Sequence, residues 1–252
     1  MTKTLRETIK KIPGSRAIAA IYFDMLFTRK LPKPQRAALK NLLKDSKSQL
    51  RQDLFALSCL NFKRDGYFVE FGAADGVHFS NTWLLEKKFG WTGILAEPAT
   101  IMHENILKKR NAILERDCVW NKTGESLFFR QTENPELSTL EAFANVDFHS
   151  DIRKNSTSYE VRTVSLEDML DRHKSPKIID FISIDTEGSE FEILECFNFG
   201  KYQFNVATIE HNFTSNRERT FKLMKENGYH RLYENISRFD DWYVHRSLLS
   251  PF

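Results

Sequence analysis

Residues 67–76 read YFVEFGAADG, and residues 93–98 read GILAEP. In each stretch an apolar run reaches an acidic residue, Glu70 in the first and Glu97 in the second. The first run then enters a loop of small residues with glycines at positions 72 and 76. Apolar runs that end at a glycine loop are typical of buried strands whose carboxyl ends face a nucleotide-like ligand. The two stretches therefore predict consecutive strands with a binding site at their carboxyl ends.

Strands and helices alternate from residue 67 onward. We predict strands at Tyr67–Phe71, Gly93–Glu97, Ala112–Val119, Ile178–Asp185, Val206–Glu210, Tyr229–Glu234 and Trp242–Arg246, and helices at Asn81–Phe89, Ile101–Lys109, Ser189–Cys196 and Arg217–Asn227. This alternation indicates an α/β fold with a mostly parallel, seven-stranded twisted sheet and helices on both faces. No helix precedes the last run, so we expect it to pair antiparallel at an edge of the sheet.

Two segments interrupt this rhythm. Glu125–Arg130 (ESLFFR) follows a turn-rich stretch, NKTG, and predicts an extra strand that forms a hairpin with Ala112–Val119. Residues 131–160 are polar and irregular. A long irregular connection in a compact domain is more often functional than idle, so we expect a lid or a wall of the substrate site. A variable surface insertion is the alternative.

The first 47 residues predict a basic helical extension ahead of a domain at 48–252. Residues 1–50 hold 12 Lys and Arg against 3 Asp and Glu, a net charge of +9. The rest of the chain holds 25 basic and 31 acidic residues of the totals of 37 and 34, a net charge of −6. The LPKP segment at 31–34 divides the extension into two helical pieces. We expect the basic arm to contact anionic headgroups or an anionic substrate, with a plain solvated helix as the alternative.

Composition excludes several classes of protein. A hydrophobic content of 41% over 252 residues argues against disorder. The longest apolar stretch, Ala17–Phe27, contains Asp24 and is too short to span a bilayer, and no cleavage site of a signal peptide follows it. The three cysteines are widely spaced, which favours reduced thiols. We expect a cytoplasmic protein, with peripheral contact to the inner membrane surface through the basic arm.

The glycine loop distinguishes between nucleotide ligands. It lacks the middle glycine of the GxGxxG fingerprint that lets the backbone approach a pyrophosphate, and the chain has no GxxxxGK[ST] phosphate loop. An acid at the end of the next strand suits ribose hydroxyls. These features favour S-adenosylmethionine over a nicotinamide dinucleotide. Further acids, Asp117, Asp185 and Glu210, fall at or beside other strand ends.

Two longer stretches carry a family resemblance. Gly66–Pro98 (GYFVEFGAADGVHFSNTWLLEKKFGWTGILAEP) and Asp180–Leu194 (DFISIDTEGSEFEIL) resemble the signatures of FkbM-type S-adenosylmethionine-dependent methyltransferases. The most specific pieces are Ser80–Thr82 and Asp185–Gly188, and the resemblance spans residues 48–246. A departure is Ala99-Thr100 after Glu97-Pro98, where a polar residue is expected. The resemblance implies a Rossmann-like class I methyltransferase fold.

The resemblance also implies a set of cofactor-binding residues. The loop after the first strand would hold the amino acid end of S-adenosylmethionine, Glu97 the ribose hydroxyls, and the segment around residue 117 the adenine. The free N–H groups at the start of the next helix suit a carboxylate. The implied residues are Glu70, Gly72, Ala73, Asp75, Gly76, Ser80, Asn81, Glu97, Asp117 and Cys118. Asp75 can instead cap the following helix or orient the loop, and Ser80 can act as a simple N-cap.

The family acts mainly on hydroxyl groups of sugars, polyketides and lipid-linked compounds. A hydroxyl needs a base or a metal to remove its proton. His211 is one candidate base, although a histidine packed at a strand end is the alternative. The other scheme is a Mg²⁺ or Mn²⁺ ion bound by Asp185 with Glu210 or Asn212. Glu187 suits either scheme.

The sequence therefore predicts an O-methyltransferase for a sugar, glycan or glycolipid hydroxyl. The alternatives are a methyltransferase for a non-sugar hydroxyl and a catalytically silent module that keeps the fold for binding. An oxidoreductase is disfavoured, because the loop carries Ala74 and no catalytic Tyr-Lys or His-Asp set is recognisable. A nucleic acid acceptor is disfavoured by the acidic body and by the lack of an NPPY-like motif.

Overall fold

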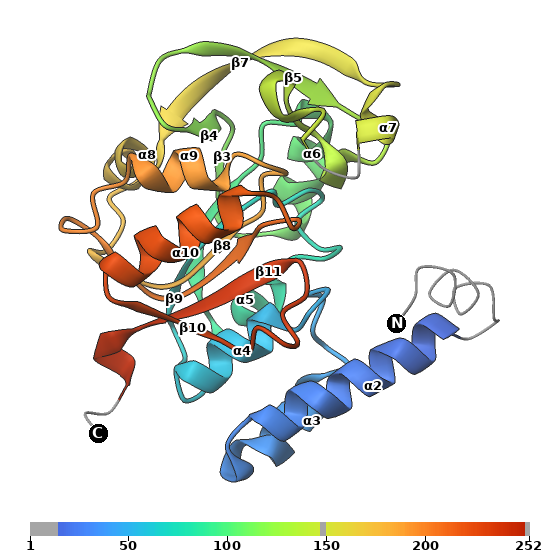
Figure 1. The fold of residues 1–252 in the computed structure, drawn as a ribbon, viewed down its shortest axis with the longest axis vertical. Coiled ribbons are helices and arrows are strands. Elements are labelled where there is room, and N and C mark those ends of the chain that lie inside the picture. The colour runs from blue at the N-terminus through green and yellow to red at the C-terminus, as the bar shows by residue number, and fades with distance from the viewer. Residues whose placement is uncertain (1–14, 147–149, 250–252) are drawn as a thin grey trace. The chain divides into compact units, whose positions relative to one another are not determined.

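The computed structural model describes residues 15–146 and 150–249 (Figure 1). The chain divides into two compact units, residues 1–45 and 46–252, and each is described by itself. Residues 1–14 of the predicted extension and residues 147–149 of the predicted insertion lie outside the described residues.

The first unit consists of helices in its described part. Helix α2 spans Ser15–Lys30, the 3-10 turn η1 spans Lys33–Gln35, and helix α3 spans Arg36–Leu42. The break lies at the LPKP segment, as predicted, because proline lacks the N–H that a continuous helix requires. Within the described residues, no helix is both long enough and apolar enough to cross a membrane. Peripheral contact with a membrane stays a prediction.

The second unit holds all the strands of the described chain. Its helices are α4 (Gln52–Cys59), α5 (Trp83–Phe89), α6 (Thr100–Lys109), α7 (Ser150–Arg153), α8 (Leu166–Arg172), α9 (Glu190–Glu195) and α10 (Asn216–Glu226), with 3-10 turns η2 (Pro135–Leu137), η3 (Glu141–Phe143) and η4 (Arg246–Leu248). Its strands are β1 (Tyr67–Phe71), β2 (Thr92–Ala96), β3 (Ile113–Glu115), β4 (Cys118–Trp120), β5 (Ser126–Gln131), β6 (Thr139–Leu140), β7 (Thr157–Ser165), β8 (Ile178–Ile184), β9 (Gln203–Glu210), β10 (Tyr229–Leu232) and β11 (Asp240–His245).

A seven-stranded sheet forms the centre of this unit. Its strand order is β10-β11-β9-β8-β1-β2-β3. All its strands but one share a direction, and β11 pairs antiparallel with both of its neighbours. The chain builds outward from β1 through β2 to β3, and then starts again on the other side of β1 with β8. Ligands of such sheets bind where the order reverses, so the carboxyl ends of β1 and β8 mark the expected site.

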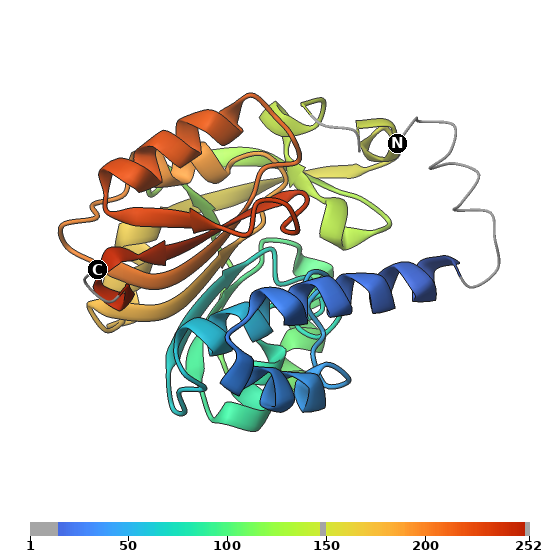
Figure 2. The same ribbon diagram turned by 60° about the horizontal axis from the view of Figure 1, so that its bottom comes forward.

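Helices cover both faces of the sheet, and this explains its composition. Helices α9 and α10 lie on one face, and α4 and α5 lie on the other (Figure 2). A strand covered on both faces needs apolar residues at nearly every position. Strand β8, with the sequence IIDFISI, is buried along all of its length except its first residue. The predicted α/β fold is confirmed.

The last predicted strand is correct in direction but not in position. Strand β11 lies inside the sheet between β9 and β10, and β10 forms the edge. The residues from Asp240 to Val244 pair with β9 and are buried, so the run has the burial of an interior strand. The prediction of an antiparallel partner is confirmed, and the prediction of an edge position is wrong.

A second, four-stranded sheet was not predicted from the sequence. Its order is β4-β7-β5-β6. The predicted strand Ala112–Val119 divides into β3 of the large sheet and β4 of the small one, because the Glu115 carboxylate accepts the N–H groups of Arg116 and Asp117 and turns the chain. Strand β5 pairs antiparallel with β7 and β6, so the predicted hairpin with Ala112–Val119 is wrong. Part of the irregular stretch 131–160 thus belongs to a sheet.

The segments that follow the two central strands, β1 and β8, are in close contact at Gly72. Gly72 has φ of +70°, and a Cβ atom at this position would lie 1.9 Å from the backbone oxygen of Asp185, which follows β8. No side chain fits there. Gly124 offers a comparison, because it has φ of +85° with nothing within 4 Å of its Cβ position.

We expect Gly72→Ala to destabilise the protein far more than Gly124→Ala. The Gly124 variant bears only the strain of a left-handed residue, about 1–2 kcal/mol. The Gly72 variant must also separate two central strands, and we expect a loss of at least about 3 kcal/mol. Urea unfolding of both variants measures the difference. Equal losses would show that the strand ends can separate freely.

Candidate functional site

Two adjoining pockets lie at the carboxyl ends of the central strands, and they share Phe71, Gly72, Glu136 and Asp185. The apolar pocket is lined by Phe71, Gly72, Ala96, Glu97, Pro98, Cys118, Val119, Phe129, Pro135, Glu136, Ser138, Leu140, Asp185, Thr186 and Ser189. The acidic pocket is lined by Gln49, Glu70, Phe71, Gly72, Ala74, His78, Phe79, Asn81, Glu136, Leu137, Asp185, Glu187, Glu210, Asn212 and Phe239. Both lie at the expected reversal of strand order.

The Glu70 carboxylate organises the segment that follows the glycine loop. It accepts a hydrogen bond of 2.9 Å from the Ser80 hydroxyl, one of 2.5 Å from the Asn81 N–H, and one from the Thr82 hydroxyl. Burial raises its pKa, and the charge of Arg110 opposes that shift. Glu70 lines the acidic pocket, but its oxygens are engaged by the protein. It therefore positions the loop, and direct contact with a cofactor stays a prediction.

Arg110 joins the same network, and the sequence offered no signal for it. Its buried guanidinium donates to the Gly76 carbonyl at 2.7 Å, to the Ser80 hydroxyl at 3.1 Å and to Glu86 Oε2 at 2.8 Å. It also lies 3.9 Å from Glu70. An arginine that follows a helix and contacts these four residues, all remote in sequence, is recognisable only from the fold. It holds the glycine loop and the SNT segment together.

Glu97 links the glycine loop to the start of α6. Its carboxylate accepts the Ala74 N–H and the Ala99 N–H, each at 2.8 Å. It lies in the wall of the apolar pocket, and burial raises its pKa to about 7. A carboxyl oxygen has two lone-pair directions, so each oxygen retains one for a ligand. This geometry fits the predicted contact with ribose hydroxyls.

The remaining loop contacts involve the backbone of Ala73 and Gly76 and the side chain of Asp75. The Ala73 carbonyl accepts the Gly76 N–H at 2.8 Å, which closes the turn. Asp75 accepts the N–H groups of Val77 and His78 and binds Lys109 at 2.8 Å, and these contacts lower its pKa. Asp75 thus orients the loop, the alternative that its sequence position allowed.

Ser80 and Asn81 lie in the segment before α5. The Ser80 hydroxyl accepts the Trp83 N–H at 3.1 Å, so it caps the helix in addition to its contact with Glu70. The Asn81 side chain donates to Ser183 at 2.9 Å and lines the acidic pocket. Its Oδ1 atom is buried and has no hydrogen-bond partner among the described residues. A donor on a ligand in the acidic pocket would satisfy this oxygen.

The structure separates the two residues predicted to face adenine. Cys118 lines the apolar pocket, beside Val119 and Phe129. Asp117 binds Arg172 at 3.0 Å, and it is not among the described residues that line this pocket. In this arrangement the Asp117 carboxylate is directed to Arg172. Its predicted contact with the exocyclic amine would require that ion pair to open.

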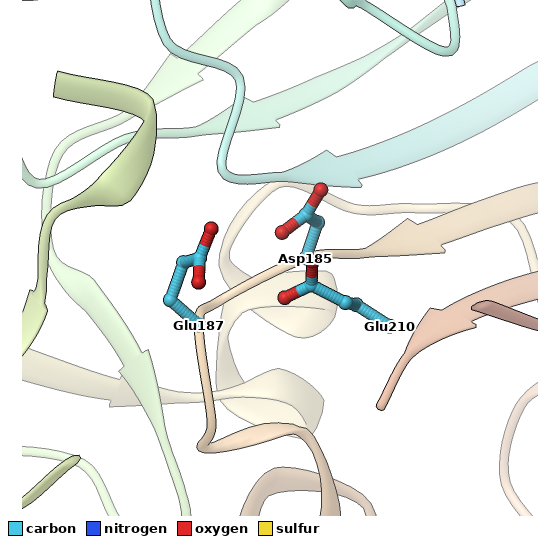
Figure 3. A group of neighbouring side chains, drawn as sticks. All are labelled: Asp185, Glu187 and Glu210. Atoms are coloured by element: carbon cyan, nitrogen blue, oxygen red, sulfur yellow. The ribbon is translucent and has the colours of Figure 1, made fainter. Parts of the chain in front are cut away.

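Three carboxylates meet in the acidic pocket (Figure 3). Asp185 follows β8, Glu187 lies two residues further in the DTEG turn, and Glu210 ends β9. One oxygen of each lies within 4.8 Å of the others. Burial, with the nearby charge of Asp240, raises the pKa of Asp185 to about 8. Burial and the charge of Asp185 raise the pKa of Glu210 well above its usual value.

The carboxylate group differs from the predicted metal ligands by one residue. Asp185 and Glu210 meet as expected, but Glu187 is the third carboxylate. Asn212 lines the pocket and donates its side-chain amide to Glu187 at 3.2 Å, so its amide group is oriented by Glu187. Oxygen donors of this type suit Mg²⁺ or Mn²⁺. Glu210 Oε2 has no hydrogen-bond partner among the described residues.

His211 faces away from the acidic pocket. Its neighbours Glu210 and Asn212 line the pocket, and His211 is not among the described residues that do. Its Nδ1 accepts the Phe213 N–H at 3.0 Å, and its Nε2 lies 3.8 Å from Asp241. Burial lowers its pKa to about 4. Side chains that follow each other along a strand end point in opposite directions, and the His211 ring lies toward Asp241. Its role as a catalytic base stays a prediction.

The predicted insertion forms a wall of both pockets. Pro135, Glu136, Ser138 and Leu140 line the apolar pocket, and Leu137 lines the acidic one. The Thr139 hydroxyl donates to the carbonyls of Thr186 and Glu187 at 3.2 and 3.1 Å. This lining fits the expectation that residues 131–160, in their described part, form a wall of the site.

Comparison with known proteins adds a family and weak structural likenesses. Residues 70–236 match the model of the family described as Methyltransferase FkbM domain. No curated protein matches the chain. A precorrin-6y C5,15-methyltransferase from Geobacter metallireducens GS-15 is 11% identical, with 76% of this chain and 84% of that chain covered and a TM-score of 0.41. An Aquifex aeolicus SAM dependent methyltransferase is 10% identical, with 82% and 96% covered and a TM-score of 0.36.

We expect the affinity for S-adenosylhomocysteine to rise with pH. Glu97 has a pKa of about 7 and accepts hydrogen bonds from hydroxyls best when it is ionised. A ligand that needs the ionised form should bind about tenfold more tightly at pH 8 than at pH 6. Calorimetry at both values checks this. Glu97→Gln serves as the control. Its side chain does not titrate, so the affinity of this variant should not change between pH 6 and pH 8. The same slope in both proteins would assign the titration to another group.

Proposed function

Because this chain belongs to the FkbM family of methyltransferases, we propose that it transfers a methyl group from S-adenosylmethionine to a hydroxyl of a sugar, glycan or glycolipid. The observation that supports a hydroxyl acceptor is the carboxylate group of Asp185, Glu187 and Glu210 beside the apolar pocket. A hydroxyl gives up its proton on methylation, and a carboxylate can accept it.

The apolar pocket fits the nucleoside part of S-adenosylmethionine. Phe71, Val119 and Phe129 offer apolar surface for a planar base, and Glu97 offers acceptor lone pairs for ribose hydroxyls. Gly72 and Asp185 line both this pocket and the acidic one. When bound, S-adenosylmethionine supplies a methyl group on a positively charged sulfur. The acidic pocket adjoins this site, and negative charge there favours a cationic ligand.

The protein would align the acceptor and receive its proton. The acceptor oxygen forms the new bond to the methyl carbon as the carbon–sulfur bond breaks, and the hydroxyl proton passes to a carboxylate. Asp185 is the best candidate, because it lines both pockets. Its raised pKa reflects burial and the charge of Asp240. A cationic donor nearby would favour its ionised form. This role replaces the one predicted for His211.

We expect Asp185→Asn to lose methyl transfer by a factor of about 10²–10⁴ while S-adenosylhomocysteine still binds. His211→Gln is the control and should retain most activity. The assay incubates the protein and S-adenosylmethionine with sugars, glycolipids and non-sugar alcohols, and mass spectrometry detects the gain of one methyl group. Activity that survives in Asp185→Asn and disappears in His211→Gln would reverse the assignment.

A catalytically silent binding module is the alternative function. The carboxylates of Asp185, Glu187 and Glu210 argue against it, because one is half-buried, two are buried, and such a group destabilises a protein that makes no use of it. Tight binding of S-adenosylhomocysteine without product from any hydroxyl acceptor in the screen would favour this alternative.

A divalent cation belongs to the same proposal. The carboxylates of Asp185, Glu187 and Glu210 converge, and Glu210 Oε2 and Asn81 Oδ1 are buried acceptors in the same pocket. Mg²⁺ or Mn²⁺ held there would lower the pKa of an acceptor hydroxyl.

We expect a chelator to reduce methyl transfer at least about tenfold and added Mg²⁺ or Mn²⁺ to restore it. Glu187→Gln should weaken the restoring metal in the same assay. Full activity after chelation would exclude a role for the metal ion, and a carboxylate would then accept the hydroxyl proton without it.

A further inference from the structure

Arg153 is a fully buried cation in the part of the chain that walls the pockets. It ends the four-residue helix α7, beyond residues 147–149, and its side chain is 1% exposed. Arginine is almost never buried to this degree unless it is paired. No local pattern in the sequence marks Arg153 as functional. Its burial therefore calls for a partner and a role.

The guanidinium of Arg153 joins two segments that are far apart in sequence. Its Nε donates to the Leu137 carbonyl at 2.8 Å, and its Nη2 donates to Glu187 Oε2 at 2.9 Å. Leu137 and Glu187 both line the acidic pocket. One residue thus connects the wall at 135–140 to the carboxylate group. The planar guanidinium can make both bonds at once, whereas a lysine ammonium has a different geometry.

Glu187 depends on such support. Its φ of +60° is a left-handed conformation that non-glycine residues adopt at a cost. Its Oε2 atom accepts hydrogen bonds from Arg153 at 2.9 Å and from Asn212 at 3.2 Å. The next residue, Gly188, has Phe143 and Val146 of the insertion within 3.2 Å of its Cβ position. The orientation of Glu187 is thus set by the insertion.

We propose that Arg153 is a positioning residue that docks the wall at 135–140 onto Glu187 and so forms the acceptor side of the site. Arg153 also neutralises one of the three carboxylates, which limits the repulsion within the group. The proposal rests on the function proposed above and adds the residue that assembles the acceptor pocket.

The test compares Arg153→Ala with wild type and with Arg130→Ala. Arg130 is the matched control, because it pairs with Glu141 in the same insertion but on the surface. We expect Arg153→Ala to lower kcat/KM for the acceptor on the order of a hundredfold, mainly through KM. Guanidinium added to the solution should restore part of the loss, and Arg153→Lys should restore less. Arg130→Ala should behave as wild type.

Hydrogen exchange provides a readout that needs no activity. The amides of Leu137 and Ser138 form turn hydrogen bonds in the docked wall, and we expect them to exchange faster in Arg153→Ala than in wild type. If Arg153→Ala does not fold, Arg153→Lys takes its place in both measurements. Unchanged exchange together with an unchanged acceptor KM would overturn the proposal. A wild-type protein without any methyl transfer would instead overturn the proposed function, and the exchange result would still stand.

Discussion

The buried carboxylate of Glu70 is the constraint around which the cofactor end of the sheet is built. An ionised carboxylate buried without partners destabilises the folded state strongly, because it loses its hydration. Three donors from the SNT segment and the nearby charge of Arg110 make the burial of Glu70 possible. Arg110 also binds the Gly76 carbonyl, so the glycine loop and the start of α5 have one common support. The conformation of the glycine loop is therefore set by contacts within the protein and does not depend on a ligand.

The charge of Glu70 is balanced by Arg110, whereas the acidic pocket holds more carboxylates than cationic partners. Asp185 and Glu210 lie close together with raised pKa values, and Glu187 forms an ion pair with Arg153. Unbalanced carboxylates repel each other and favour any ligand that brings positive charge or hydrogen-bond donors. The wall at 135–140 and the Asp185 side chain line both pockets. Under the proposed function, the methyl donor and the acceptor would share these lining residues.

Local patterns predicted the large sheet well. Strands β1 (YFVEF) and β8 (IIDFISI) are mostly apolar runs. Such runs are typical of strands that are buried on both faces of a sheet. The small sheet escaped prediction because its order depends on long-range pairing. Strand β4 is three residues long and finds its parallel partner more than forty residues later, in β7. Strand β11 was placed at an edge because the sequence does not show that β10 lies outside it.

The sequence by itself determined the α/β fold, the methyl donor and the acids at the strand ends, because apolar periodicity and the glycine loop are local. Tertiary structure decided which side chains meet. His211 and Glu210 are adjacent in sequence, yet only Glu210 reaches the pocket, since neighbouring side chains at a strand end face opposite ways. Arg110 and Arg153 carry no local signal, because each acts on a segment remote in sequence. Their roles follow from the distances between segments, which a linear pattern does not contain.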